Sequence, residues 1–271
     1  MNTLKNQLKN ILWKFWMFRG MQSLKQAGVS ASKIEQAIRE TIYNKITAEE
    51  KVWIDRIEQI RKQFTDNPTP VTILDFGAGN PNSQRSEEEM ARGSVSTTTY
   101  GEICTGSKPA LWALFLFKLI RTIQPESAIE LGTCIGISAA YQSAAQELNG
   151  KGRLITVEGS EAIADLAKKN IESLGLFQTE VLCGTFKKIL PGILKKLTPV
   201  DYIFIDGHHD EQATDAYFEV LLPYLSPGAI LVFDDISWSS GMRRAWEKIS
   251  KHPAVTLAVD LKMLGICKMQ D

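Results

Sequence analysis

The feature that most constrains the fold is a regular alternation of short apolar runs with helical segments from Ser127 onward. Strands that alternate with helices of this length indicate βαβ units and a parallel sheet covered by helices on both faces. The apolar runs predict strands over residues 128–131, 154–157, 180–182, 202–205, 230–233, 255–259 and 264–268. The segments between the first six predict helices over residues 137–148, 161–174, 186–196, 211–224 and 240–250.

The last two apolar runs are joined differently from the others. Only residues 260–263 separate them, which is too short for the crossover that parallel neighbours need. They are therefore predicted to form an antiparallel hairpin. The predicted fold class is α/β, a Rossmann-like seven-stranded, mostly parallel sheet with helices on both faces and a C-terminal antiparallel hairpin.

The chain divides into three predicted regions. Residues 1–70 form an N-terminal helical extension, in which a helix over 48–64 ends before the proline-rich stretch at 67–70. Residues 71–107 form a loop-rich substrate or lid segment, with a strand over 71–75 and a polar loop over 82–106. Residues 108–271 form the α/β domain, which begins with a helix over 108–121.

The first helix of the extension has an apolar face. The residues that recur at three- and four-residue spacing are Leu4, Leu8, Ile11, Leu12, Phe15 and Phe18. Basic residues accompany them, and no acid appears before Glu35. Such a helix can lie on a membrane surface or dock a partner. The alternative is that Trp13 and Trp16 pack on the rest of the protein or across a homodimer formed through the N-terminal helices.

Composition excludes several classes of protein. Lys+Arg and Asp+Glu each number 31, so the chain has no bulk field that would recruit nucleic acid. The longest apolar runs fall far short of the ~20 residues of a transmembrane helix. Four scattered cysteines form neither a zinc motif nor a disulfide framework, and they favour a reducing compartment, so the expected location is the cytoplasm.

Polar residues and glycines at the carboxyl ends of the first three predicted strands of the domain indicate a cofactor site. Glu130 and Gly132 end the first strand, Thr133 follows, and Gly136 and Ser138 open the next helix. Ligands of doubly wound sheets bind at these strand ends. The free N–H groups of a helix N-terminus can receive a carboxylate, and Glu130 can receive an ammonium group. Further along, Glu158 can accept ribose hydroxyls, and Gly184, Thr185 and Phe186 can flank an adenine.

Two other nucleotide-binding patterns fit these residues less well. A dinucleotide dehydrogenase would carry Gly-x-Gly-x-x-Gly, whereas Gly132 and Gly136 form Gly-x-x-x-Gly. The stretch from Asp75 to Gly79 resembles the same kind of turn, but Pro81 and a polar run follow it instead of an apolar helix. It is therefore assigned to a turn or substrate-side loop and not to the cofactor.

The ends of the next two strands carry the candidate catalytic groups. Asp206, Asp234 and Asp235 are expected beside one cleft, where three acids suit Mg²⁺ or Ca²⁺. The alternative is capping, hydrogen bonding and cofactor contact without metal. His209, and after it His208, are the candidate general bases, since histidine titrates near neutral pH.

Together these segments resemble the catechol O-methyltransferase-like group of class I S-adenosylmethionine-dependent methyltransferases, which includes bacterial small-molecule enzymes with an Ile-Asp-Gly-x-His signature. The resemblance covers about residues 108–269. It rests on residues 129–138, 156–158, 204–209 and 232–236.

The resemblance implies a role for each of these positions. Glu130, Gly132 and Ser138 would hold the methionine end of S-adenosylmethionine, Glu158 the ribose, and residues 184–186 the adenine. Asp206, Asp234 and Asp235 match metal-binding positions, although Asp235 replaces the usual asparagine. His209 stands where the catechol enzymes place a catalytic lysine.

The predicted function is therefore methyl transfer from S-adenosylmethionine to a hydroxyl of a small-molecule acceptor. His209 would act as general base, and a divalent metal such as Mg²⁺ is left open. The alternatives are N-methylation of a small molecule or peptide and a cofactor-binding interaction protein without turnover.

Overall fold

Seven strands form a mixed sheet in the computed structural model, which describes residues 2–26, 32–80 and 83–271. The strand order is β10-β11-β9-β8-β5-β6-β7. β11 pairs antiparallel with β10 and with β9, and the other pairs of neighbouring strands in this sheet are parallel. The strands are β5 (Ser127–Leu131), β6 (Arg153–Glu158), β7 (Thr179–Cys183), β8 (Val200–Ile205), β9 (Leu225–Phe233), β10 (Val255–Asp260) and β11 (Gly265–Met269). The predicted fold class and the terminal hairpin are confirmed.

The central strands are buried on both faces. In β8, Tyr202 and Phe204 belong to one hydrophobic core, and Ile203 and Ile205 belong to the other. A parallel sheet covered by helices on both sides buries successive side chains on opposite faces, so its strands are continuously apolar. This explains why the strand positions are readable from the sequence.

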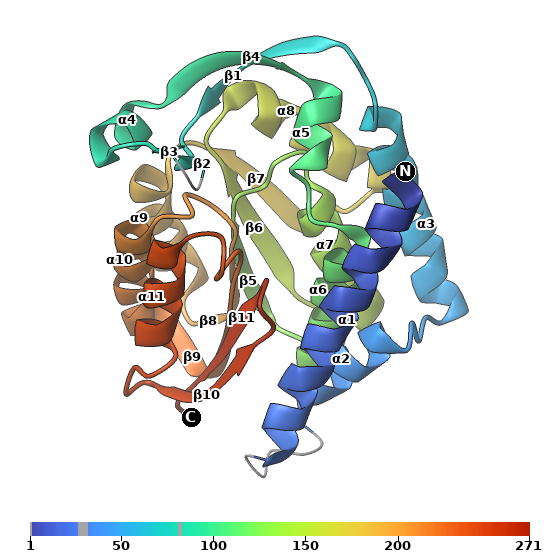
Figure 1. The fold of residues 1–271 in the computed structure, drawn as a ribbon, viewed down its shortest axis with the longest axis vertical. Helices are drawn as coiled ribbons and strands as arrows, with labels where there is room; N and C mark the ends of the chain where they lie inside the picture. Colours follow the sequence, from blue (N-terminus) through green and yellow to red (C-terminus); the bar gives the residue numbers. More distant parts are fainter. Residues whose placement is uncertain (1, 27–31, 81–82) are drawn as a thin grey trace.

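Helices cover the two faces unequally (Figure 1). The larger layer packs on the first core and contains α1 (Asn2–Gln26), α2 (Lys33–Ile42), α3 (Ala48–Phe64), α6 (Ala110–Ile123), α7 (Ile137–Asn149) and α8 (Glu161–Leu174). The other layer contains α9 (Phe186–Leu197), α10 (Glu211–Leu221), the short 3₁₀-helix η1 (Leu222–Tyr224) and α11 (Ser240–Ile249). Among the described residues, no helix has the length and apolar character needed to cross a bilayer.

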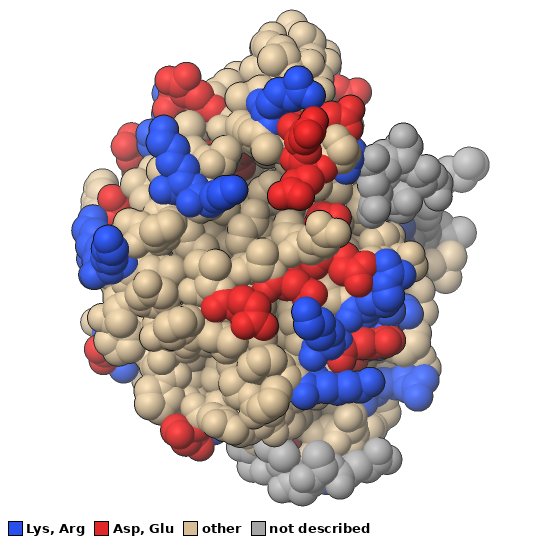
Figure 2. All heavy atoms as spheres, turned by 90° about the vertical axis from the view of Figure 1, so that its left-hand side faces the viewer, with Lys and Arg blue, Asp and Glu red and all other residues tan. Residues whose placement is uncertain are grey.

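Basic and acidic side chains are intermingled on the face that carries α9, α10 and α11 (Figure 2). Two ion pairs join α10 to α11 there. Arg244 Nη2 lies 2.5 Å from Glu211 Oε2, and Lys248 Nζ lies 2.7 Å from Asp215 Oδ2. Exposed pairs of this kind are worth about 0.2–1 kcal/mol each, so burial of the apolar faces accounts for more of the packing.

The helix α1 is confirmed, but its predicted apolar face points into solvent. The side chains on that face are 42% to 65% exposed: Leu8, Ile11, Leu12, Phe15 and Phe18. Met17, Met21 and Leu24 lie on the opposite side of the helix and are buried, and Trp13 packs on Trp112 of α6. The side chains of Leu4 and Lys5 lie outside the described residues. Because both sides of α1 are apolar, spacing alone could not show which side faces the protein.

The segment after α3 contains more regular structure than predicted. Its elements are β1 (Pro70–Asp75), β2 (Gly79–Asn80), β3 (Ser83–Gln84), α4 (Glu87–Arg92), β4 (Ser94–Thr99) and α5 (Tyr100–Thr105). The expectation of a polar loop over 82–106 is therefore wrong for residues 87–105. β4 pairs antiparallel with β1 and has no buried residue, so its threonines favour a strand without an apolar alternation. Ser86 and Thr99 begin α4 and α5 with capping boxes, a signal that the polar composition obscured.

The β1–β4 pair lies beside α8 and places residues 75–79 near the carboxyl ends of the central strands (Figure 1). The backbone N–H of Ala78 donates a hydrogen bond to the carbonyl oxygen of His208 at 3.0 Å. The N–H of Leu74 donates to Ser160 Oγ at 3.3 Å. Hydrogen bonds thus hold the predicted turn at 75–79 against the edge of the sheet that carries the candidate site. Pro81, which follows it in the sequence, lies outside the described residues.

Candidate cofactor and catalytic site

A cavity of 360 Å³ lies at the carboxyl ends of β5, β6, β7 and β8. Small-molecule sites in proteins commonly measure about 300–1,000 Å³. The chain order of the strands reverses between β5 and β8, which is where doubly wound sheets bind ligands. Residues 73–79 form the opposite wall, and the ring of Phe76 lies against Gly159. The structure thus brings residues 75–79 against the strand ends that carry the predicted cofactor residues.

Six of the ten predicted cofactor residues line this cavity, namely Gly132, Glu158, Gly184, Thr185, Phe186 and Asp206. The other four do not line it: Glu130, Thr133, Gly136 and Ser138. Of these, Glu130, Thr133 and Ser138 are buried polar residues. The strand ends are therefore assembled as the spacing predicted, while their contacts with a cofactor stay predictions.

The turn from β5 to α7 needs glycine at two positions. Gly132 has φ +108°, and Gly136 has φ +85° at the N-terminus of α7. L-residues with side chains rarely adopt such angles. A Cβ at residue 132 would also lie 1.9 Å from the carbonyl oxygen of Asp206. The glycines therefore let the turn pack directly against the end of β8.

Glu130 is fully buried, and its carboxyl group accepts hydrogen bonds inside the protein. Its Oε1 accepts a hydrogen bond from Gln142 Nε2 at 2.9 Å, and its Oε2 accepts one from Thr156 Oγ1 at 2.7 Å. Burial raises the pKa of Glu130 to about 7. The carboxyl group is thus harder to ionise than that of an exposed glutamate.

Glu158 is fixed at the cavity wall by backbone N–H groups. Cys134 N donates to its Oε2 at 2.9 Å, and Ser160 N donates to its Oε1 at 3.0 Å. Burial raises the pKa of Glu158, and these two hydrogen bonds oppose that rise. A carboxylate held by two N–H groups has a defined direction, which suits recognition of a pair of hydroxyl groups.

His209 lines the cavity close to Asp206, with 3.8 Å between His209 Nε2 and Asp206 Oδ1. Its ring faces Trp238, with 5.9 Å between the ring centroids. Burial lowers the pKa of His209 to about 4, so the imidazole is neutral at pH 7 and can accept a proton. A φ of +48° at this residue is strained backbone of the kind that recurs at functional sites.

His208 has protein partners instead of an open position. Its Nδ1 lies 2.8 Å from the hydroxyl oxygen of Tyr217, and its ring packs edge-on against Phe186. Its carbonyl oxygen accepts the hydrogen bond from Ala78. These contacts indicate that His208 supports the cavity wall, and they favour His209 among the two predicted bases.

The predicted acid cluster forms in part. Asp206, His209 and Asp234 offer ligand atoms that all lie within 4.8 Å of one another. Asp235, the third predicted metal ligand, is not a member of this group. It lines a second cavity of 270 Å³, together with Trp238 and with Leu12, Trp13 and Trp16 of α1.

Lys108 was not predicted, and its ammonium group lies inside this cluster. Its Nζ is 3.0 Å from Asp206 Oδ2 and donates a hydrogen bond to Asp234 Oδ2, and its side chain is only 7% exposed. Burial alone would lower the pKa of Lys108, but the two carboxyl groups raise it above its usual value. The lysine is therefore charged at neutral pH.

The residues present do not fit a divalent ion while Lys108 occupies this position. A doubly charged ion about 4 Å from an ammonium group is repelled by about 8 kcal/mol at an effective dielectric constant of 20. The charge of Asp234 is also already compensated, because Lys108 lowers the pKa of that carboxyl group. Asp206 has its pKa raised by burial and by the neighbouring carboxylate of Asp234.

A faint signal for Lys108 was present in the sequence. The lysine directly precedes Pro109, the N-cap of α6, and a cation is disfavoured at the positive end of a helix dipole. A buried lysine at such a place needs acidic partners from elsewhere in the fold. Trp238, which lines both cavities, had no comparable signal because it lies in the short connection after β9.

Comparison with known proteins points to one class. Residues 129–236 match the family model described as a methyltransferase domain. The chain is similar to a catechol O-methyltransferase from Niastella koreensis, with 36% identity over 124 residues, 45% of this chain and 54% of the relative. A protein-L-isoaspartate O-methyltransferase from Thermotoga maritima is 32% identical over 110 residues, 41% of this chain and 32% of the relative. The chain thus spans about half or less of the length of these relatives.

Solved structures show the same fold. An O-methyltransferase from Bacillus cereus in complex with S-adenosylhomocysteine has a TM-score of 0.52 and 23% identity, over 81% of this chain and 91% of that chain. An O-methyltransferase from Streptomyces achromogenes in complex with S-adenosylmethionine has a TM-score of 0.52 and 24% identity, over 61% of this chain and 82% of that chain.

Proposed function

We propose that this protein transfers a methyl group from S-adenosylmethionine to a hydroxyl oxygen of a small molecule, with His209 as general base. The observation that carries the proposal is the position of His209, a neutral imidazole beside Asp206 in the wall of the strand-end cavity. The two curated relatives described above are both named for O-methyl transfer, which favours oxygen over nitrogen as the acceptor atom.

The cofactor would lie along the ends of β5, β6 and β7. Glu158 would receive the ribose hydroxyls, and residues 184–186 would flank the adenine, as the resemblance implies. The methionine end would lie toward Gly132 and the N-terminus of α7, where free N–H groups favour a carboxylate. S-adenosylmethionine, when bound, supplies a sulfonium methyl group that moves to the acceptor oxygen.

His209 removes the proton of the acceptor hydroxyl as the new bond forms. The proton moves to Nε2, the ring nitrogen that faces Asp206. The carboxylate of Asp234 favours the charged imidazole, which stabilises the product of this proton transfer. Trp238 packs on the ring and restricts its orientation. Positioning and removal of water then contribute the rest of the rate.

Divalent-metal assistance, which the sequence left open, is not part of this proposal, because Lys108 fills the position that an ion would need. The homodimer through the N-terminal helices stays a prediction, and the exposed face of α1 is the surface that it would use.

Calorimetry with S-adenosylhomocysteine, followed by transfer of a labelled methyl group to a panel of phenols, catechols and aliphatic alcohols, tests the proposal. His209→Gln should lower turnover by roughly 10²–10⁴-fold and leave cofactor affinity unchanged. Turnover that survives this substitution would remove His209 from the mechanism. Cofactor binding without any methylated product, in these acceptors and in cell extract, would instead favour a binding protein without turnover.

A further inference from the structure

The cluster formed by Asp206, His209 and Asp234 contains a cation that belongs to the chain itself. We propose that the ammonium group of Lys108 takes the place of a divalent metal ion here, so that the site excludes metal and works without it. Catalysis without metal rests on the proposed methyl transfer, whereas exclusion of metal from the cluster is independent of it.

The ammonium group lies between two carboxyl groups. Lys108 Nζ contacts one oxygen from each of two carboxyl groups, Asp206 Oδ2 and Asp234 Oδ2. These are two of the three groups in the described residues that could together hold an ion. An ammonium group has three N–H donors and is compact, so it can satisfy several carboxylate oxygens as a metal ion would.

Lys108 is held both at its backbone and along its side chain. Its backbone carbonyl oxygen accepts a hydrogen bond from Arg61 Nη2 of α3 at 2.9 Å. Its side chain runs over Phe204 of β8, with Nζ 5.7 Å from the ring centroid. The ammonium group therefore reaches the ends of β8 and β9 from a backbone that is held by α3, and its side chain is only 7% exposed.

Lys108 also affects the orientation of the proposed base. Asp206 faces Lys108 through Oδ2 and His209 through Oδ1. Because one oxygen of Asp206 is held by the ammonium group, the other keeps its direction toward the imidazole. Lys108 is thus a positioning residue that acts on His209 through Asp206, as a bound metal would act through its ligands.

Binding of Mn²⁺, followed by electron paramagnetic resonance, tests metal exclusion in the wild-type protein. After dialysis against EDTA, the protein is mixed with millimolar Mn²⁺, with and without S-adenosylhomocysteine. The signal of free Mn²⁺ should then be the same as in a sample without protein. Turnover should be the same in EDTA and in Mg²⁺. Stoichiometric Mn²⁺ binding that Asp234→Asn abolishes would overturn the proposal, as would turnover that EDTA stops and Mg²⁺ restores.

Removal of the ammonium group should convert the cluster into a metal site. Lys108→Ala and Lys108→Gln leave Asp206, Asp234 and His209 in place, and each should gain Mn²⁺ binding by roughly tenfold or more. Mg²⁺ should raise the melting temperature of these variants and not that of the wild type. A folded variant that gains no Mn²⁺ affinity would contradict the proposal. If neither variant folds, the Mn²⁺ measurement on the wild-type protein tests the proposal by itself.

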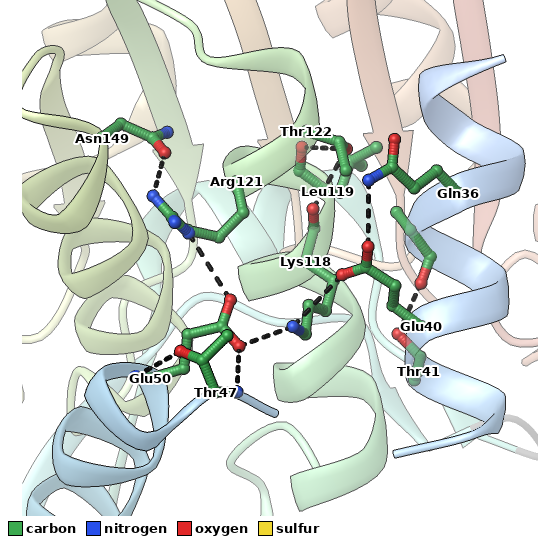
Figure 3. Close-up of polar contacts among 11 residues, drawn as sticks. Gln36, Glu40, Thr41, Thr47, Glu50, Lys118, Leu119, Arg121, Thr122 and Asn149 are labelled. Atoms are coloured by element: carbon green, nitrogen blue, oxygen red, sulfur yellow. Dashed lines mark hydrogen bonds and ion pairs between the residues drawn. The ribbon is translucent and has the colours of Figure 1, made fainter. Parts of the chain in front are cut away.

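Lys118 provides a matched control (Figure 3). It is also a buried lysine with two acids, since its Nζ lies 2.7 Å from Glu50 Oε2 and 3.2 Å from Glu40 Oε2. Arg121 Nε lies 3.5 Å from Glu50 Oε1 and would keep a positive charge there after Lys118→Gln. This control should lose stability without gaining Mn²⁺ affinity. Mn²⁺ bound equally by both lysine variants would show a general effect of lost charge and would overturn the proposal.

Methyl transfer and the replacement of a metal ion by Lys108 can be refuted separately. If no acceptor is methylated while the wild type excludes Mn²⁺ and Lys108→Gln binds it, the proposed function fails and the ammonium-for-metal replacement stands. If acceptors are methylated only when Mg²⁺ is present, methyl transfer stands and the replacement fails.

Discussion

Gly132 and Asp206 approach each other so closely that a Cβ on the first would lie 1.9 Å from the carbonyl oxygen of the second. Gly132 follows β5 and Asp206 follows β8, and the N–H of Asp206 donates a hydrogen bond to the carbonyl oxygen of Leu131 at 2.8 Å. The turn that carries the predicted cofactor contacts is therefore in direct backbone contact with the residue beside the proposed base. A change in either one displaces the other.

Gly132→Ala should damage both stability and cofactor binding. The new methyl group meets backbone, which cannot rotate away, and φ of +108° is strained for alanine. We expect a loss of about 1–3 kcal/mol in the free energy of unfolding, measured by urea denaturation, and weaker binding of S-adenosylhomocysteine. Gly192→Ala in α9 is the control, since a Cβ there meets nothing within 4 Å. Equal stability of the two variants would contradict this account of the turn.

Glu130 should make the protein without cofactor less stable as the pH rises. Its pKa is about 7 in the folded state against a model value of 4.5, because burial disfavours the charge. A raised folded pKa gives stability that is fully present below pH 4.5 and lost as the pH rises through 7. The difference corresponds to about 3 kcal/mol for this fully buried group.

Urea denaturation between pH 5 and pH 8.5 measures this loss. Glu130→Gln should remove most of it, so that the variant gains stability relative to the wild type at the upper end of the range. The exposed Glu126→Gln serves as control and should follow the wild-type curve. If the free energy of unfolding depends on pH in the same way in the wild type and in Glu130→Gln, Glu130 ionises without a cost in stability.

His209 should titrate far below the usual range of histidine. Nuclear magnetic resonance of protein labelled with ¹⁵N-histidine, assigned by His209→Gln, should give a pKa of about 4, because burial disfavours the imidazolium. Since its folded pKa is lowered from 6.5, its contribution to stability is present above pH 6.5 and lost as the pH falls toward 4. A measured pKa near 6.5 would mean that the ring is solvated, and the proposed environment of the base would be wrong.

The parts of this structure that the sequence predicted share one physical property. Buried strands such as β8 are apolar over most of their length, and glycines such as Gly132 are required by close backbone contact, so both leave local patterns in the sequence. Glu158, Asp206 and His209 could be placed because the ends of parallel strands meet at one edge of the sheet.

The parts that escaped prediction depend on contacts distant in sequence. Lys108 meets Asp234 across 126 positions of the chain, and only the fold brings them together. Which side of α1 faces the protein depends on Trp112 and on β10, not on the helix itself. The exposed strand β4 has no apolar alternation, because it has no core to pack on.

Trp238 should select the acceptor more than it affects the cofactor. It lies between the strand-end cavity and the second cavity beside α1, and it packs on His209. Trp238→Ala should raise the KM of an aromatic acceptor by roughly tenfold, through loss of about 1.4 kcal/mol of stacking and burial, with cofactor affinity little changed. Trp238→Phe should retain most of the acceptor affinity. A larger effect on cofactor binding than on the acceptor would place Trp238 at the cofactor instead.

The exposed apolar face of α1 should be covered in solution by a second copy of the chain. Five large apolar side chains that are 42% to 65% exposed form a continuous stripe, which monomeric proteins rarely leave in water, and two-fold dimers are the commonest way to cover one. Light scattering at tens of micromolar protein should give twice the monomer mass. Ile11→Glu with Phe15→Glu should give the monomer, whereas Asn10→Glu, on the other side of the helix, should not. A monomeric wild type that cosediments with anionic vesicles would instead assign this stripe, with its neighbours Lys9 and Arg19, to a membrane surface.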